Sequence, residues 1–290
     1  AGAATFTATA DGVTSVPYTV TVTDQKVTGI VISGSNTVQQ GGTLALSASV
    51  TPGTAVDKNV TWSLVSGSEL ATISASGTVT ANAFGNLTVR ATANDGSGKY
   101  ADKNILITAP AGSPVSWAGK SWWVIDSDGS QFGGGSGSVV LLLNDNSIGN
   151  MPYHTASNDP GYKNSSVRNY LVGTSFLSSA YQAKLSPHSK VGDKVWLASS
   201  YEVWGSSRGS NYADPYEIAR QFSYFSSQNV STPSNSAQVQ AKFGNVSAWL
   251  RSPSTVQPKD HVHVYYGTGQ LGTDKCTVSY AIRPCVILNP

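Results

Sequence analysis

The chain has 290 residues and a formal net charge of +2, and only 12% of its residues are Asp, Glu, Lys or Arg. So small a charge cannot gather phosphates, and no stretch clusters Lys and Arg with aromatic residues, so nucleic acid is not an expected partner. No apolar run approaches the roughly 20 residues of a membrane-spanning helix. Short Val, Thr, Ile and Tyr runs between Gly, Asn, Asp and Ser predict a mainly β fold, and the length allows two domains.

The first predicted element is a β-hairpin in residues 1–24, which an internal repeat identifies. Ala4–Gly12 (ATFTATADG) aligns with Leu87–Gly96 (LTVRATANDG), and each copy continues into a second strand, at Tyr18–Asp24 and at Lys103–Ala109. Residues 1–24 are therefore expected to be the last two strands of a module whose earlier strands are missing.

Short alternating strands between the two copies predict a sandwich of seven strands. Their order resembles the bacterial Ig-like group 2 module over residues 25–110. The matching segments are VTGIVIS from Val27, GGTLALSASVTP from Gly41, VTWSL from Val60 and ASGTVTA from Ala75. The resemblance implies a spacer or adhesin module without catalytic residues, with Trp62 as its core anchor.

Pro110–Pro114 is compact and rich in Pro and Gly, which predicts a linker at 111–114 and a second domain at 115–290. Helix is predicted within 165–183 and, from a weaker pattern, within 216–225. Several short strands flank these helices, so the second domain is predicted to be α+β with a β majority.

Four ordered segments of the second domain resemble the bacterial domain of unknown function 6273, itself similar to C-type-lectin-like folds. They are WWVID from Trp122, DKVWLASSYEV from Asp193, WLRSP from Trp249 and IRPCVIL from Ile282. The resemblance implies a C-type-lectin-like fold and an extracellular context, but it brings no established activity.

The sequence offers no positive sign of catalysis, so no enzymatic activity, cofactor or metal site is expected. His261 and His263 share one face of a strand, but two imidazoles are too few to hold a metal. Asp126–Asp128 opens like a calcium loop, yet Gly137 stands where the closing acidic residue is required. No Ser/His/Asp constellation, phosphate loop or carboxylate pair is recognisable.

Ligand binding is the open alternative for the second domain. Arg251 and Arg283 could bind a carboxylate, although hydrogen bonds that join strands to loops are the preferred interpretation. Aromatic residues at 201–204, 212–216 and 265–266 could stack on sugars, with at least half of them expected in the core.

The sequence allows two kinds of covalent modification. Cys276 and Cys285 lie close in sequence and are predicted to form a disulfide, which would stabilise the fold by about 2–3 kcal/mol, with buried thiols as the alternative. Sequons permit N-glycosylation but occur about as often as chance gives in a chain this rich in Ser and Thr. They begin at Asn59, Asn86, Asn164, Asn229 and Asn245.

The hairpin leads to the predicted function, because two strands alone are marginal in water and their apolar face must be covered. The residues expected to enter a neighbouring subunit are Ala4, Phe6, Ala8, Val20 and Val22. Donation of this kind is head-to-tail, so it predicts a homopolymeric structural fibre, secreted onto a bacterial or virion surface. The alternative is an adhesin or lectin-like receptor-binding protein on an Ig-like stalk, with glycans as partners. The start at Ala1 has neither an initiator Met nor a signal peptide, which favours a mature secreted chain over a fragment boundary.

Overall fold

The computed structural model describes residues 2–145, 147–157, 161–208, 214–216, 218–231, 234, 236–254 and 260–290. It is mainly β and divides into two compact units. The N-terminal unit comprises the chain up to Asn82 together with Asn86–Ile107, and the C-terminal unit comprises Ala83–Gly85 and Thr108–Pro290.

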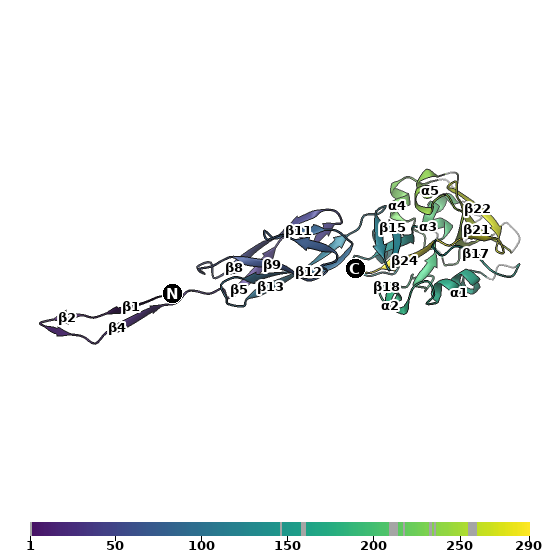
Figure 1. The fold of residues 1–290 in the computed structure, drawn as a ribbon. Coiled ribbons are helices and arrows are strands. Elements are labelled where there is room, and N and C mark those ends of the chain that lie inside the picture. The colour runs from purple at the N-terminus through teal and green to yellow at the C-terminus, as the bar shows by residue number, and fades with distance from the viewer. Residues whose placement is uncertain are drawn as a thin grey trace. The chain divides into compact units, whose positions relative to one another are not determined.

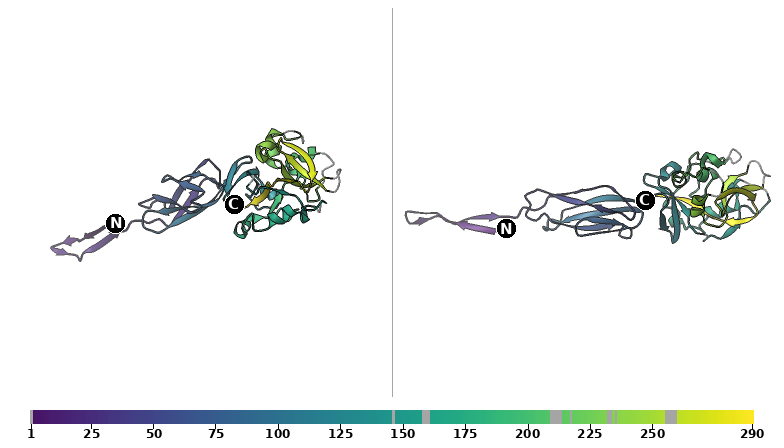
Figure 2. Two further views of the ribbon diagram at one scale, coloured as in Figure 1. Left: turned by 45° about the vertical axis from the view of Figure 1, so that its right-hand side comes forward. Right: turned by 90° about the horizontal axis from the view of Figure 1, so that it is seen from above.

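The N-terminal unit begins with the predicted hairpin, whose long strands are β1 (Gly2–Phe6) and β4 (Tyr18–Val22) (Figures 1 and 2). The short strands β2 (Thr9–Ala10) and β3 (Val13–Thr14) lie at its tip. Asp11 and Gly12 connect them with φ angles of 51° and 81°. Two consecutive left-handed residues match the turn that suits the twist of a hairpin, which explains the Asp-Gly pair.

The Ig-like part of this unit is built from two main sheets and a separate strand pair. One sheet has the order β6-β13-β12-β9, the second β10-β11-β7, and β5 pairs with β8. The bounds are β5 Gly29–Ser33, β6 Thr37–Gln39, β7 Thr43–Ala45, β8 Ser47–Thr51, β9 Val60–Ser66, β10 Ala71–Ile73, β11 Thr78–Ala81, β12 Gly85–Ala93 and β13 Tyr100–Thr108. Seven strands were predicted for the sandwich, and the structure has nine. The segment 43–50, predicted as one strand, is divided at Leu46 into β7 and β8, and β6 was not predicted.

Alternating burial along β12 shows how the sequence builds the core of this part. Leu87 and Val89 are buried between the sheets, and Ile105 and Ile107 of β13 lie in the same cluster. Trp62 does not occupy the centre, contrary to the prediction. It is half-buried and packs beside the cluster, with its ring against Gly77.

The C-terminal unit contains a six-stranded and a five-stranded sheet. The six-stranded sheet consists of β14 Pro114–Trp117, β15 Lys120–Asp126, β16 Val139–Leu143, β24 Pro284–Leu288, β18 Leu185–Ser186 and β19 Val195–Leu197. The five-stranded sheet consists of β17 Asn150–Pro152, β23 Ser279–Ala281, β20 Ala248–Pro253, β21 His261–Tyr266 and β22 Gln270–Lys275. Strands β16 and β24 are buried over their whole length, which accounts for their nearly continuous apolar sequence.

Short helices surround these sheets. They are η1 Gly129–Phe132, η2 Tyr162–Asn164, α1 Ser166–Val172, α2 Ser179–Gln182, α3 Ser200–Trp204, η3 Gly205–Arg208, α4 Ser223–Ser227 and α5 Ala237–Phe243. Helix within 165–183 is confirmed, whereas the helix predicted in 216–225 begins only at Ser223. Among the described residues, no helix has the length and apolar character needed to cross a membrane.

The predicted linker is shorter than expected. Gly112 donates its N–H to the carbonyl of Val124 at 2.6 Å, and Ser113 accepts from the N–H of Val124 at 2.9 Å. Lys242 also donates to the carbonyl of Gly112 at 2.8 Å. Residues 112–114 are therefore part of the C-terminal unit, and β14 continues directly from them.

The structure corrects the predicted disulfide, because Cys276 and Cys285 are both buried, reduced thiols. Cys285 lies inside β24, opposite Leu142 and Trp196, in the six-stranded sheet. Cys276 follows β22 in the other sheet, and its Sγ donates to the carbonyl of Ala156 at 3.2 Å. Nearness in sequence was misleading because the chain passes from one sheet to the other between the two residues.

Candidate assembly hairpin and pocket

The hairpin separates its side chains into an apolar face and a threonine face. Ala4 lies opposite Val20, and Phe6 lies opposite Tyr18. Residues opposite one another share a face, and successive residues alternate between faces. The apolar face therefore consists of Gly2, Ala4, Phe6, Tyr18, Val20 and Val22. The threonine face holds Ala3, Thr5, Thr19 and Thr21, with the hydroxyls of Thr5 and Thr19 3.1 Å apart.

The apolar face lacks a cover in the part of the chain that the structure describes. Every residue from Gly2 to Lys26 is exposed, including Phe6 at 59% and Tyr18 at 71%. Six of the thirteen exposed large apolar side chains among the described residues lie between Phe6 and Val22. Within the described residues, β1 and β4 also pair only with each other, so both outer edges of the hairpin are open.

Four of the five residues predicted for the donor segment share the apolar face, and the fifth does not belong to the long strands. Ala8 lies beyond the end of β1 at Phe6. Its N–H donates to Ser15 Oγ at 3.0 Å, and its carbonyl accepts from the N–H of Ser15 at 2.8 Å. The pairing offset changes here by one residue, so the donor segment is not one continuous strand.

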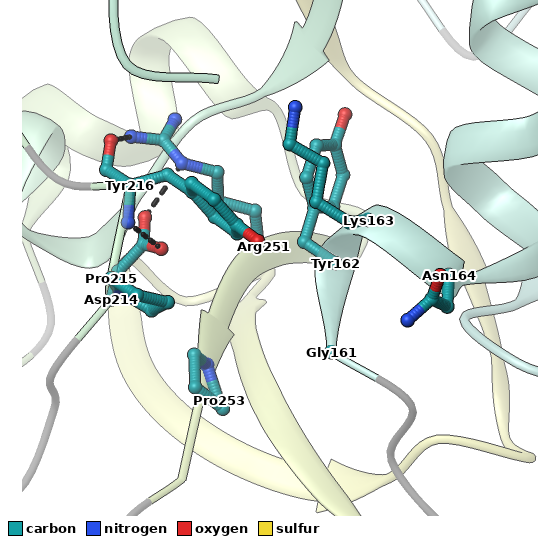
Figure 3. A pocket seen from close by; sticks show the side chains of 9 residues that line it. All are labelled: Gly161, Tyr162, Lys163, Asn164, Asp214, Pro215, Tyr216, Arg251 and Pro253. Carbon is teal, nitrogen blue, oxygen red and sulfur yellow. Dashed lines mark hydrogen bonds and ion pairs between the residues drawn. The ribbon is translucent and has the colours of Figure 1, made fainter. Parts of the chain in front are cut away.

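A small pocket opens in the C-terminal unit above Arg251 (Figure 3). Its volume is about 100 Å³, which is room for a few water molecules and much less than a typical ligand site. It is lined by Gly161, Tyr162, Lys163, Asn164, Asp214, Pro215, Tyr216, Arg251 and Pro253. The aromatic residue Tyr212, predicted as a sugar platform, lies outside the described residues.

Arg251 is fully buried, and all five of its N–H donors are in use. Nη1 and Nη2 donate to the two carboxylate oxygens of Glu202 at 2.8 and 2.6 Å. Nε donates to Asp214 at 2.6 Å. The remaining donors reach the carbonyls of Leu197 at 2.7 Å and Tyr216 at 3.4 Å. Arg251 thus joins β20 to α3 and to neighbouring loops, and it has no donor left for a carboxylate ligand.

His188 completes this cluster through both of its ring nitrogens. Its Nδ1 accepts from the N–H groups of Lys190 and Val191 at 3.2 and 3.1 Å, so the ring proton is on Nε2. Nε2 donates to Glu202 Oε1 at 3.1 Å. The N-cap residue Ser199 adds its own N–H to Glu202 Oε2 at 2.9 Å. Glu202 therefore accepts four hydrogen bonds in a dry site.

The pKa values of the two carboxyls in the cluster, Glu202 and Asp214, shift in opposite directions. Burial by itself would raise the pKa of Glu202, but attraction to Arg251 and the hydrogen bonds from His188 and Arg251 outweigh it and lower the pKa to about 2. For Asp214, burial is the larger effect and raises the pKa despite the contact with Arg251. The cluster is a structural ion-pair network. The preferred interpretation of Arg251, hydrogen bonds that join a strand to loops, is confirmed, but its partners Glu202 and Asp214 were not predicted from the sequence. The one sequence signal of the cluster was the capping pattern of Ser199 and Glu202.

The acidic segment at Asp126–Asp128 forms a turn and not a calcium loop. Asp126 Oδ1 accepts from the N–H of Asp128, and Asp128 Oδ1 from the N–H of Ser130, which is a turn. Among the described residues, no three His, Cys, Asp or Glu side chains lie together in a group that could hold a metal ion. All five sequon asparagines are exposed, so these positions permit glycosylation, as the sequence does, without favouring it. They are Asn59, Asn86, Asn164, Asn229 and Asn245.

Comparison with known families agrees with both resemblances. Residues 26–103 match the bacterial Ig-like domain (group 2), and residues 137–290, more than half of the chain, match the family described as domain of unknown function (DUF6273). The chain belongs to the DUF6273 family. The two domains follow in the predicted order, and the C-type-lectin-like assignment of the DUF6273 domain stays a prediction.

One curated relative and several solved structures are similar to parts of the chain. The tail tube protein pb6 of Escherichia phage T5 is 42% identical over 88 residues, which are 29% of this chain and 19% of that protein. The chain thus spans about a fifth of this relative's length. The adhesin InvE of Yersinia pseudotuberculosis is 15% identical with a TM-score of 0.32, covering 99% of this chain and 78% of that one. Domains 4–9 of the surface layer protein SbsC are 20% identical with a TM-score of 0.26, covering 49% and 23%.

Proposed function

We propose that this DUF6273 protein is a structural subunit of a fibre at a virion or bacterial surface, joined to a neighbouring subunit through the hairpin of residues 2–22. The observation that carries the proposal is the uncovered apolar face around Phe6 and Val20, with an open strand edge on each side. A strand pair of this kind is a template for pairing with another chain. The 88-residue likeness to a phage tail protein supports a place on a virion.

The head-to-tail geometry follows from where the hairpin lies in the sequence. The hairpin and the surface that receives it are different parts of the molecule, so the contact repeats from one subunit to the next. Such a contact gives an open filament unless its rotation closes a ring. Identical subunits are therefore the proposed partners.

Electron microscopy and light scattering of residues 1–290 and of a 25–290 truncation test the fibre. We expect filaments from the full chain and none from the truncation. Phe6→Asp places a charge on the apolar face and should abolish assembly, whereas Thr5→Asp places it on the threonine face and should be tolerated. Monodisperse full chain at all concentrations would contradict the proposal.

The repeat that relates the hairpin to Leu87–Ala109 favours a second candidate, an adhesin or receptor-binding protein on a stalk of Ig-like modules. In that case the C-terminal unit would bind a ligand such as a glycan, and the hairpin would serve only the stalk. A glycan array probed with 1–290 and 25–290 separates the two candidates. Equal binding by both chains, without filaments, would favour the adhesin.

A further inference from the structure

The chain contains a second copy of the hairpin in which the partner strands are present. In the alignment, Ala4 and Phe6 of the apolar face correspond to Leu87 and Val89 of β12. Both β12 residues are at most 1% exposed. The face that is bare in the hairpin is therefore the face that is buried in β12.

The second strand of the hairpin agrees with this correspondence. Val20 and Val22 correspond to Ile105 and Ile107 of β13, and both isoleucines are fully buried. The apolar face of the hairpin thus matches the core-facing side of β12 and β13 in both strands, except at Tyr18, which corresponds to the half-buried Lys103.

The pairing register is also the same. Thr5 and Thr19 of the hairpin, whose hydroxyls are 3.1 Å apart, correspond to Thr88 and Asn104. Thr88 Oγ1 donates to Asn104 Oδ1 at 3.0 Å. Two positions that meet across one hairpin therefore meet across the other, on the side that faces away from the core.

The neighbours of β12 and β13 show what the hairpin lacks. β12 pairs with β9, where Val89 lies opposite Leu64, and β13 lies next to β6. Val79 of the facing sheet and Leu46, which follows β7, lie in the same core cluster. A partner must therefore offer two strands with unpaired edges, equivalent to β9 and β6. It must also offer a facing sheet whose apolar side chains point into the gap between those two strands.

The intact Ig-like domain of a second copy does not offer this place, because β12 and β13 already occupy it. The hairpin also could not displace them easily. Ala4 would stand where Leu87 fills the core, and Phe6 in place of Val89 offsets the missing volume only in part, so the hairpin competes poorly with strands already in place. A sandwich without β12 and β13 has no competing strands.

We propose that the hairpin completes an Ig-like sandwich that lacks its last two strands. β1 pairs with the equivalent of β9 and β4 with the equivalent of β6, with Phe6 and Val20 inside. This inference shares with the proposed function only the use of the hairpin in assembly. It names an incomplete Ig-like module, in place of the intact identical subunit proposed above, as the partner that receives the hairpin.

The test is hydrogen exchange on the full chain carrying an N-terminal extension. A second copy of residues 25–83 is fused before residue 1, so that the hairpin follows it as β12 and β13 follow β11. The expected result is at least a 100-fold slowing of amide exchange in residues 3–6 and 18–22 relative to residues 1–290. Phe6→Asp should remove this protection, and Thr5→Asp should keep it.

A matched extension with residues 25–108 supplies a sandwich that is already complete. There the hairpin amides should exchange as fast as in residues 1–290. Fast exchange in the first extension, or slow exchange in both, would overturn the proposal. Filaments of residues 1–290 combined with fast exchange in the first extension would keep the fibre and reject the Ig-like partner. Slow exchange in the first extension, without filaments of residues 1–290, would support the Ig-like partner and reject the fibre.

Discussion

Glu202 illustrates how a buried charge can stabilise this fold. Its carboxylate accepts hydrogen bonds from Ser199, His188 and both terminal nitrogens of Arg251, so it exchanges every bond to water for a bond to protein. Removing one member of such a cluster leaves the others charged and dry, which costs more than the intact pair contributes. Replacing a single member of the cluster should therefore reduce the stability of the fold more than the intact ion pair adds to it.

Glu202→Gln is expected to lower the free energy of unfolding of the C-terminal unit by about 3–5 kcal/mol, because Arg251 loses its charged partner. Chemical denaturation measures the effect. Glu69 is exposed, and Glu69→Gln should change stability by less than about 0.5 kcal/mol. Equal stability of Glu202→Gln and the parent chain would show that the cluster is not an essential ion pair.

The same carboxylate predicts how stability depends on pH. The pKa of Glu202 is about 2 in the folded state and 4.5 as its ordinary value. A carboxyl whose pKa is lowered by folding stabilises the fold at pH values above its ordinary pKa. This contribution is lost as the pH falls from about 4.5 towards 2. The raised pKa of Asp214 acts in the opposite direction and reduces the loss. Urea unfolding of the C-terminal unit across this range should show the decline, and Glu202→Gln should flatten it.

At the level of elements, the turn between β10 and β11 is fitted to Trp62. Gly77 has a φ of +82°, and a Cβ added there would lie 2.7 Å from Cε2 of Trp62. Gly41 has a φ of +81°, but nothing lies within 4 Å of its added Cβ. The two glycines therefore share the backbone requirement and differ only in the contact.

Gly77→Ala should destabilise the N-terminal unit by about 1–3 kcal/mol more than Gly41→Ala, because the indole ring must move to admit the methyl group. Thermal unfolding of the two variants gives the difference. Equal losses would mean that the left-handed backbone alone demands glycine at Gly77.

The strands were predictable where alternation was regular, as in β9 and β12, and the repeat gave the hairpin together with its apolar face. Helices α3 and α5 were not predictable, because helices of five and seven residues show little periodicity in sequence. Side-chain caps from Ser199 and Ser236 determine where these helices begin. The Arg251 cluster brings together residues that are far apart in sequence, and only the fold reveals that contact. The disulfide prediction failed for the opposite reason, because Cys276 and Cys285 are close in sequence but lie in different sheets.

For the whole molecule, the two units should behave as separate folding bodies, because each contains its own buried core. Calorimetry of residues 1–290 should resolve two transitions. Gly77→Ala should move only one of them and Glu202→Gln only the other, since distant substitutions act independently. A single transition that both variants shift would show that the units unfold cooperatively.

The buried charges also affect how the C-terminal unit responds to heat. Ions are hydrated less favourably as water warms, so the cost of drying Arg251, Glu202 and Asp214 falls with rising temperature, while the gain per area of apolar burial levels off. The ion cluster therefore contributes more to the balance in warm conditions than in cold ones. A C-terminal unit whose cluster was replaced by well-packed apolar residues would gain stability at room temperature and lose that advantage on heating.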